Sequence, residues 1–288
     1  MMQAIIDIGS NSVRLAIFSG GNIIFRDKVT AKLGQGFYET LVIKSDAIRR
    51  NLDAVKKLFD TAISRGVNKE NVFIFATATV REAKNKADFC DQIYALTGLY
   101  VDILSESMEA NCALWGALGG GDGAVLDLGG GSMELITAKK GSVTFSHSIN
   151  LGAVKLNDMF GADKSALIDY VTKRLNEYGK VNIDKLFAVG GSATCCAYIL
   201  SGDKAYDMDK NHLRVVTRDK LYALADVLYK KTPTERATQY NVSLKRAETI
   251  HAGALTLALV LDYLCLDAFT VSEKDNLDGY YTLKVDRK

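Results

Sequence analysis

The chain has 288 residues, of which 48% are hydrophobic and 24% charged, a composition typical of folded globular proteins that argues against disorder. Its 36 basic and 34 acidic side chains leave a net charge of +2, which argues against a surface that binds nucleic acid by bulk charge but leaves a local basic patch open. The length favours two domains over one compact core.

The first half of the chain predicts a three-stranded meander followed by helices and strands. An apolar run at 4–8 ends in Asp-Ile-Gly, and further apolar stretches follow at 13–18 and 23–29. Apolar residues at helical spacing predict a helix over 45–64, with Ser45 as its N-cap. Later elements are expected as strands over 72–76 and 100–104 and helices over 81–96 and 107–118.

A glycine run at 119–123 marks the predicted domain boundary, which gives domains 1–119 and 120–288. Beyond it the first pattern returns, because an apolar run at 124–128 ends in Asp-Leu-Gly and is followed by two apolar stretches. This internal repeat indicates two homologous halves. Helices are then expected over 166–178, 192–200, 220–229 and 246–263, and strands over 186–189 and 269–272. The alternation predicts an α/β fold with mixed sheets.

The first strand ends in a turn suited to binding an anion. In Asp-Ile-Gly-Ser-Asn-Ser, residues 7–12, Gly9 allows a sharp turn, and Asn11 and Ser12 add polar donors to the backbone N–H groups. An ordinary hairpin turn explains this segment equally well, because short glycine motifs recur by chance.

A second turn, Asp-Leu-Gly-Gly-Gly-Ser-Met-Glu at 127–134, carries a stronger signal. Its small residues are Gly129, Gly130, Gly131 and Ser132. Three successive glycines let the backbone approach a phosphate closely, and a turn without such a function rarely needs all three. Strand alternation places Glu134 on the same face as Ser132, so that Asp127 and Glu134 could hold a divalent cation or position water. Solvent-exposed acids are the alternative.

Three further groups stand at element ends. Gly190, Gly191 and Ser192 follow a strand and open a helix with Ser192 near its N-cap, where phosphate is attracted, although tight strand–helix packing also uses glycine. Arg81 follows a Thr-rich turn and could grip a phosphate with paired donors, or simply pair with a nearby acid. Glu109 lies in the first turn of a helix, where acids commonly serve only the helix dipole.

Several other classes of site are not expected. The five cysteines form no Cys-x-x-Cys pair, which favours free thiols in the cytoplasm over a zinc site. The three histidines lack metal-ligand spacing, His251 is expected to be partly buried in a helix, and no Walker-type phosphate loop is present. The N-terminus has no secretory pattern, and the apolar stretch 252–266 is short enough to favour a buried helix over a membrane span.

Taken in order, these segments resemble the exopolyphosphatase/guanosine pentaphosphate phosphatase family, the Ppx/GppA phosphatases. The matching segments are 7–12, 76–85, 127–134, 149–154, 189–194, 246–253 and 271–272. The family belongs to the actin-like/sugar kinase/Hsp70 superfamily, so the resemblance implies two ribonuclease-H-like domains with a cleft between them. That duplication agrees with the internal repeat.

The resemblance also implies the roles of the site residues. Glu109 matches the family's catalytic glutamate, a general base that takes a proton from the attacking water. Asp127 and Glu134 match acids that orient water or bind Mg²⁺, the implied cofactor. The residues implied to line the phosphate path are Asn11, Ser12, Arg81, Gly129, Gly130, Gly131, Ser132, Gly190, Gly191, Ser192 and Arg246.

The implied activity is hydrolysis of terminal phosphoanhydride bonds of inorganic polyphosphate or guanosine pentaphosphate (pppGpp) in the cytoplasm, with no nucleic-acid or membrane partner. A homodimer is compatible with the sequence. Met108, Asn111 and the segment 275–279, Asp-Asn-Leu-Asp-Gly where the family has Gly-Leu-Arg-Glu-Gly, depart from the family pattern, and an expected arginine is missing. These departures keep open a polyphosphate or (p)ppGpp sensor with little turnover. An ATP-dependent small-molecule kinase of the same superfamily is a third hypothesis.

Overall fold

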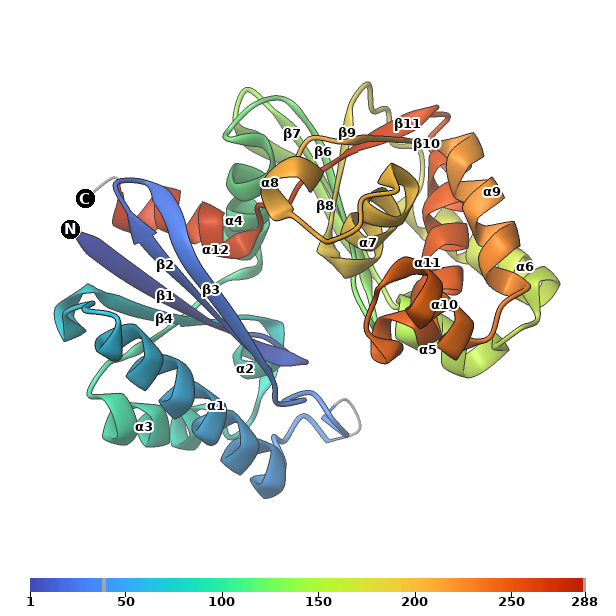
Figure 1. Cartoon of the computed structure of the whole chain (residues 1–288). Coiled ribbons are helices and arrows are strands. Elements are labelled where there is room, and N and C mark those ends of the chain that lie inside the picture. Colours follow the sequence, from blue (N-terminus) through green and yellow to red (C-terminus); the bar gives the residue numbers. More distant parts are fainter. Residues whose placement is uncertain (38–39, 287–288) are drawn as a thin grey trace. The chain divides into compact units, whose positions relative to one another are not determined.

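The structure is a computed structural model that describes residues 1–37 and 40–286. Contacts divide the chain into two compact units, one formed by residues 1–109 with the end of the chain from Tyr280, and one formed by Ala110–Gly279 (Figure 1). The chain therefore passes between the units twice, within α4 (Glu106–Leu118) and at the end of α12 (Asn276–Tyr280). The boundary predicted between residues 119 and 120 falls in the turn directly after α4 and stays a prediction.

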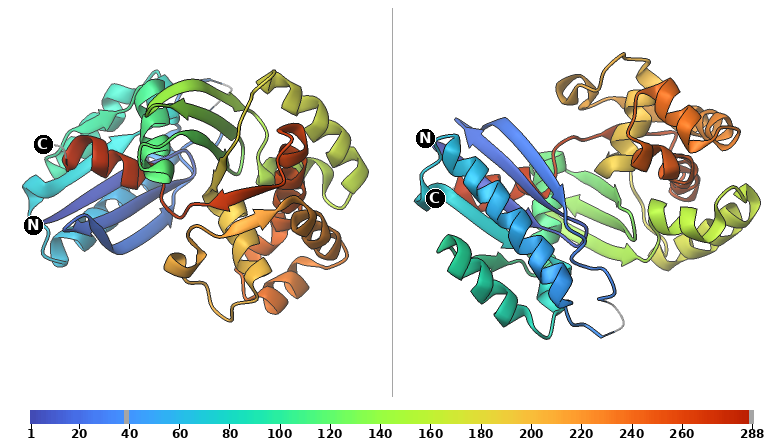
Figure 2. Two further views of the ribbon diagram at one scale, coloured as in Figure 1. Left: turned by 90° about the horizontal axis from the view of Figure 1, so that it is seen from above. Right: turned by 60° about the horizontal axis from the view of Figure 1, so that its bottom comes forward.

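The first unit is a five-stranded sheet in the order β3-β2-β1-β4-β5. Its strands are β1 (Met2–Ile8), β2 (Ser12–Ser19), β3 (Asn22–Thr30), β4 (Val72–Ala76) and β5 (Val101–Ile103). The first three form the predicted antiparallel meander, and β4 and β5 run parallel to β1. Helices α1 (Ser45–Ser64) and α3 (Lys86–Thr97) cover one face, where Val55, Leu58 and Phe89 join alternate residues of the strands in the core (Figure 2).

The second unit is a six-stranded sheet in the order β10-β11-β9-β6-β7-β8. Its strands are β6 (Gly123–Leu128), β7 (Met133–Lys139), β8 (Ser142–Ile149), β9 (Leu186–Val189), β10 (Val215–Thr217) and β11 (Ala268–Val271). Its remaining helices are α5 (Ala153–Phe160), α6 (Lys164–Leu175), α7 (Gly190–Ser201), α8 (Met208–Asn211), α9 (Arg218–Tyr229), α10 (Pro233–Tyr240) and α11 (Leu244–Tyr263).

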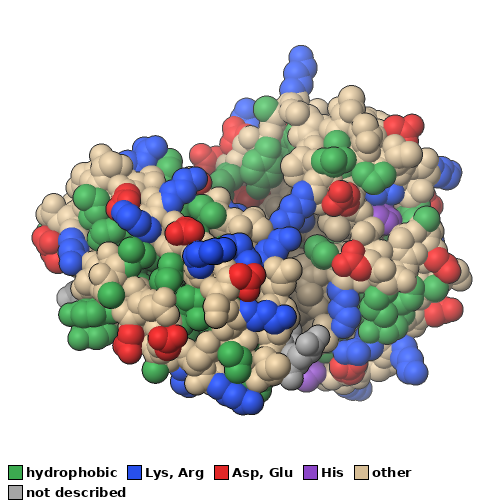
Figure 3. Space-filling model, turned by 90° about the horizontal axis from the view of Figure 1, so that it is seen from below, with side chains coloured by type: hydrophobic (Ala, Val, Ile, Leu, Met, Phe, Trp, Pro, Cys, Tyr) green, Lys and Arg blue, Asp and Glu red, His purple; other side chains and the backbone are tan. Residues whose placement is uncertain are grey.

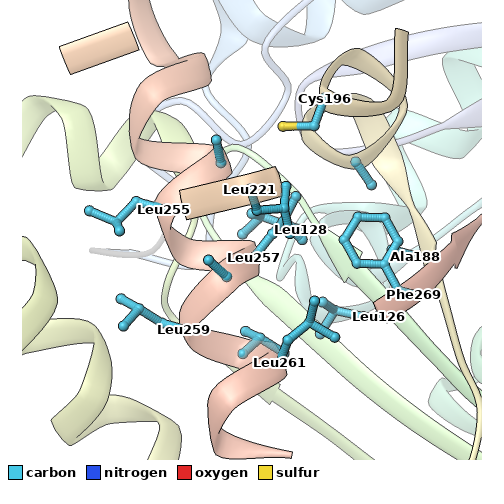
Figure 4. Close-up of a cluster of buried hydrophobic side chains, with 14 of the residues drawn as sticks. Leu126, Leu128, Ala188, Cys196, Leu221, Leu255, Leu257, Leu259, Leu261 and Phe269 are labelled. Carbon is cyan, nitrogen blue, oxygen red and sulfur yellow. The ribbon is translucent and has the colours of Figure 1, made fainter. Parts of the chain in front are cut away.

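Helix α11 is the centre of the second unit. Its side chains are buried almost without interruption from Ala247 to Leu261, and Leu257 and Leu261 lie beside Leu126 of β6 and Phe269 of β11 (Figure 4). Contact on all sides explains the apolar stretch that the sequence predicted as a buried helix. Among the described residues, no helix combines the length and apolarity that crossing a membrane requires. Basic and acidic side chains are interspersed on the face seen in Figure 3, in keeping with the small net charge of +2.

The two halves repeat each other in detail, which confirms the duplication predicted from the sequence. In both sheets an antiparallel meander is followed by strands parallel to its first member, β1 or β6. Each meander has a β-bulge in the same place, at Ile17/Phe18 and at Thr137/Ala138. The turns that follow both bend through glycines with positive φ, Gly21 and Gly141.

The helix predicted over 81–96 is wrong, because the structure has two helices there. The first, α2 (Ala78–Glu82), ends where Ala83 takes an extended conformation with ψ of 130°, and α3 begins at Lys86. Between them the Asn85 side chain bonds the backbone of Ile43, accepting from its N–H at 3.0 Å and donating to its carbonyl at 2.9 Å. A bond to a segment so distant in sequence ends the helix where local pattern would continue it.

Other local features also differ from the predictions, and Lys44, not Ser45, is the N-cap of α1. Helix α7 begins at Gly190 with Val189 as N-cap, so that Ser192 lies in the first turn and not at the cap. Helix α10 was not predicted, although it has a readable signal, since Thr232 and Glu235 form a capping box around Pro233 at the helix start.

A neutral histidine is built into the packing of α11. His251 is 3% exposed, and its Nδ1 lies 2.9 Å from Nη1 of the buried Arg236 while its Nε2 lies 3.1 Å from the Gly161 carbonyl. Because a guanidinium only donates, Nδ1 must accept, and the proton is on Nε2. Burial and the Arg236 charge lower the pKa of His251 to about 4.

We therefore expect acid to destabilise the protein through His251. The unfolded chain takes up a proton below the ordinary histidine pKa of 6.5, whereas folded His251 stays neutral until about 4, so stability is complete above 6.5 and is lost as the pH falls between these values. The free energy of unfolding should drop by about 2 kcal/mol between about pH 7 and pH 5 in urea denaturation. His251→Gln should flatten this slope, and His147→Gln on exposed β8 should not. An unchanged slope in His251→Gln would contradict the assignment.

Candidate functional site

The first glycine turn presents backbone N–H groups to solvent. The N–H of Gly9 donates to the Ser12 carbonyl at 3.1 Å, and the carbonyls of Ser10 and Asn11 accept bonds from the segment 31–34. Ser10 and Asn11 are exposed, and within the described residues no hydrogen bond uses their amide N–H groups. With its carbonyls held and its amides open, this turn can bind an anion.

The second glycine turn repeats this construction. The N–H of Gly129 donates to the Ser132 carbonyl at 3.0 Å, and the carbonyls of Gly129 and Gly130 accept bonds from the segment 153–155. The amides of Gly130 and Gly131 take part in no hydrogen bond within the residues that the structure describes. Gly152 packs directly under the turn, since a Cβ there would lie 2.3 Å from the Gly130 carbonyl carbon. Gly152 was not predicted as a site residue, although it lies in the segment 149–154 that resembles the family.

Each half places an acid on its first strand, but the partner of that acid differs. In the first unit Asp7 is 3% exposed and lies opposite Arg14, whose Nε donates to Asp7 Oδ2 at 2.8 Å. In the second unit Asp127 lies opposite Glu134 in the β6–β7 register. A guanidinium already neutralises the first acid, whereas two carboxylates face one another on β6 and β7, an arrangement that a cation stabilises.

Glu134 is held by two hydroxyl groups, one of them from Ser132, which strand alternation places on the same face. It accepts hydrogen bonds from Ser132 and, at 2.7 Å, from Ser148. Burial raises the pKa of Glu134, and these two hydroxyl groups oppose the shift. No group of three or more His, Cys, Asp or Glu side chains suited to a metal occurs in the described part of the chain, so a metal here would take its other ligands from water or substrate.

The glycine pair at the start of α7 leaves room for two charged side chains. A Cβ on Gly190, whose φ is +83°, would lie 2.4 Å from Asp127 Oδ1, and one on Gly191 would lie 1.9 Å from Arg246 Nη2. Ser192 follows, 1% exposed, beneath Gly253 of α11. The structure thus brings Asp127 and Arg246 to the N-terminus of α7, where the helix dipole also favours an anion.

In the first unit the predicted base and the predicted phosphate-binding arginine bind each other. Ser105 caps α4, accepting at Oγ from the Met108 N–H at 3.2 Å, and so fixes the turn that carries Glu109. Arg81 Nη1 donates to Glu109 Oε2 at 2.8 Å and to the Leu104 carbonyl at 2.9 Å. Both side chains stay partly exposed. The pair therefore holds a carboxylate in a defined orientation at an accessible helix start.

Thr79 was not among the predicted site residues. Its side chain is 3% exposed, and its hydroxyl has no hydrogen-bond partner among the described residues. Gly34 lies against both this hydroxyl and Ser10, at 3.6 Å and 3.3 Å from the position of an added Cβ. A buried hydroxyl without a partner is costly, so its position beside the first turn indicates a donor for a bound group. The Thr-rich turn at 77–79 was the available sequence signal.

Known proteins similar to this chain were found by sequence and by structure. The model of the Ppx/GppA phosphatase family matches residues 15–279. The chain belongs to the Ppx/GppA phosphatase family. A solved structure of the family, the type II variant of the Aquifex aeolicus Ppx/GppA phosphatase, is 26% identical and superposes with a TM-score of 0.85 over 99% of both chains. The two α/β units are accordingly the ribonuclease-H-like halves of the actin-like superfamily, as the sequence predicted.

Two curated relatives are longer than this chain. The bifunctional 3-dehydroquinate synthase/phosphatase of Fusobacterium nucleatum is 27% identical over 100% of this chain and 47% of its own length. The guanosine-5'-triphosphate,3'-diphosphate pyrophosphatase of Vibrio atlanticus is 26% identical over 94% of this chain and 56% of its own. The chain thus spans about half the length of these Ppx/GppA relatives.

The predicted site residues of this Ppx/GppA chain fall into two groups. Those in the first unit are Asn11, Ser12, Arg81 and Glu109. Those in the second unit are Asp127, Gly129, Gly130, Gly131, Ser132, Glu134, Gly190, Gly191, Ser192 and Arg246. Within each group the structure brings turns and charged side chains together at the ends of parallel strands. Their roles in binding and catalysis stay predictions.

Proposed function

We propose that this chain hydrolyses terminal phosphoanhydride bonds of inorganic polyphosphate or pppGpp and releases orthophosphate. The observation that carries the proposal is the Glu109 carboxylate held at 2.8 Å by Arg81 at the start of α4. Membership of the Ppx/GppA family and the two glycine turns with open amides support it. The Vibrio relative is named for the pyrophosphatase reaction of guanosine-5'-triphosphate,3'-diphosphate.

In this mechanism Glu109 takes the proton of the attacking water. A carboxylate does so when it lies about 2.6–3.2 Å from that water in the productive complex. The bond from Arg81 fixes the orientation of the carboxylate at the start of α4. The predicted role of Arg81 in phosphate binding is thereby extended to orienting the base.

The glycine turns supply the electrostatic part of the mechanism. Within each unit, the open amides, at Ser10 and Asn11 or at Gly130 and Gly131, can donate to phosphate oxygens. Arg246 at the start of α7 adds a positive charge. Preorganised donors of this kind stabilise the charge that develops on the transferred phosphoryl group.

Mg²⁺ is the proposed cofactor. Asp127 and Glu134 fit it, since two facing carboxylates offer hard oxygen ligands and Mg²⁺ commonly keeps one or two carboxylates with several waters. Bound there, the ion would neutralise negative charge on the phosphate groups.

One assay tests the proposal directly. Phosphate release is measured with Mg²⁺ from polyphosphates of several chain lengths and from pppGpp, side by side. Release from either substrate class, absent in Glu109→Gln, supports the proposal. No release from any of them would overturn it.

A sensor with little turnover is the second candidate, and one observation favours it. Leu277, only 2% exposed, lies within 275–279, the segment that lacks the arginine of the family motif. A buried leucine there supplies no charge for the transition state. Tight binding of polyphosphate or (p)ppGpp in calorimetry without any phosphate release would establish this alternative.

Thr79→Val tests the donor that the sequence missed. The free energy of unfolding should change by less than about 1 kcal/mol, because the hydroxyl makes no bond to give up within the described chain. The KM for substrate should rise about three- to tenfold through the lost hydrogen bond. The measurement is steady-state phosphate release with urea denaturation of the same samples, and Thr61→Val on α1 is the control. An unchanged KM would remove Thr79 from the site.

A further inference from the structure

Helices α12 and α4 pack so closely that their backbones are in contact. A Cβ on Gly279 of α12 would lie 1.8 Å from the Cys112 carbonyl oxygen, and one on Gly116 of α4 would lie 2.0 Å from the Asp275 carbonyl oxygen. Each helix therefore contributes a glycine where the other passes. Both clashes are with backbone, so no side-chain rotation could relieve them. Cys112 lies one turn beyond Glu109 on the same helix.

Two acidic side chains cap the start of helix α12. Asp275 Oδ1 accepts from the Leu277 N–H at 2.9 Å, and Asp278 Oδ2 accepts from the Asp275 N–H at 3.0 Å, so the two acids cap the helix reciprocally. Leu277 is buried beside them. The segment that departs from the family motif thus keeps a defined helix and the glycine that contacts α4.

The residue after Gly279 is fixed in the first unit. The Tyr280 ring stacks on Phe75 of β4 with ring centroids 4.6 Å apart, and its hydroxyl donates to Asp102 of β5 at 3.1 Å. Lys284, in the following π-helix Tyr281–Val285, pairs with Asp102 at 3.6 Å.

Contacts of β5, α4 and α12 connect to Glu109 one after another. Asp102 of β5 is followed after one residue by Leu104, whose carbonyl accepts the same Arg81 group that binds Glu109. Glu109 is on the same helix as Cys112, and Cys112 contacts Gly279. The next residue, Tyr280, bonds Asp102 of β5. Glu109 is thus bonded to Arg81 and is continuous, through α4, with the helix segment that Gly279 contacts.

We propose that Gly279 and Tyr280 are positioning residues that hold the Glu109 carboxylate in place through α4. The inference rests on the proposed role of Glu109 as general base. A larger side chain at Gly279 pushes α4 off α12 and misplaces the base while leaving the glycine turns intact. Misplacing a catalytic group by about 1 Å can cost about a hundredfold in rate.

Gly279→Ala should lower kcat about ten- to a hundredfold and leave KM within about twofold. Gly121→Ala is the matched control, since its added methyl group would meet only the Leu118 carbonyl at 3.3 Å, and it should keep the wild-type kcat. Tyr280→Phe preserves the ring stack and removes the bond to Asp102, and it should lower kcat about threefold or more with KM unchanged. It serves as the test if Gly279→Ala does not fold.

A double-mutant comparison separates positioning from general distortion. In a Glu109→Gln background the residual rate should not fall further with Gly279→Ala or Tyr280→Phe, because the group they position is already gone. An equal fold loss in both backgrounds would overturn the proposal.

A second readout needs no turnover. The carboxyl ¹³C chemical shift of Glu109 should change in Gly279→Ala or Tyr280→Phe as it does in Arg81→Ala, and stay unchanged in Gly121→Ala. If the wild type releases no phosphate, the proposed function fails while this shift still decides the positioning. An unaltered shift in both α12 variants would overturn it.

Discussion

Glu109→Gln should lower kcat for phosphate release about a hundred- to ten-thousandfold while KM changes little. General-base catalysis contributes about 10²–10⁴ in rate, and an amide cannot take the proton of the attacking water. The amide oxygen can still accept the bond from Arg81, so the variant should keep the local geometry and the fold. The measurement is steady-state phosphate release from the better substrate, with thermal unfolding to verify stability.

Glu106→Gln is the matched control for this variant. Glu106 lies in the same first turn of α4 but is exposed, where an acidic side chain favours the helix dipole. The control should keep wild-type kcat and lose less than about 1 kcal/mol of stability. Equal loss of activity in both variants would assign the effect to the start of α4, and full activity in Glu109→Gln would remove Glu109 from the mechanism.

The sequence predicted those features of the fold that depend on local pattern. The two Asp-apolar-Gly turns fall at the same point of two meanders because alternation, glycine positions and strand lengths all agree there. The same agreement located α1 at 45–64 and β9 at 186–189. The break after Glu82 could not be predicted, because it depends on Asn85 bonding Ile43, a residue far away along the chain.

In the candidate site, too, local features were predicted and contacts between segments were not. The sequence shows where glycine turns and acidic residues occur. The partner of each charged side chain, however, is set by the register of the strands and the packing of the helices. Asp7 meets an arginine and Asp127 a glutamate, although the two turns read alike. Arg81 is predicted to bind phosphate, and in the structure it binds Glu109, a partner that the sequence did not identify. The Arg81–Glu109 pair links segments distant in sequence, and no local period encodes it.

Gly152→Ala should damage both stability and activity more than any other single methyl group added near the second turn. The new Cβ would lie 2.3 Å from the Gly130 carbonyl carbon and from the Gly131 nitrogen, so backbone must move. The bonds from the segment 153–155 to this turn are then weakened. Overpacking and lost hydrogen bonds together should cost about 2–4 kcal/mol of unfolding free energy. Displaced amides should lower kcat/KM about a hundredfold or more.

Gly131→Ala separates the two effects, because it adds the same methyl group to the turn itself where nothing lies within 4 Å of the new Cβ. Stability should stay within about 1 kcal/mol of wild type. KM should rise, since the methyl group occupies the space that an approaching phosphate would use. Urea denaturation and phosphate-release kinetics on both variants decide the matter. If Gly152→Ala kept its affinity for substrate while losing stability, the turn would be a packing feature and the anion site would have to lie elsewhere in the second unit.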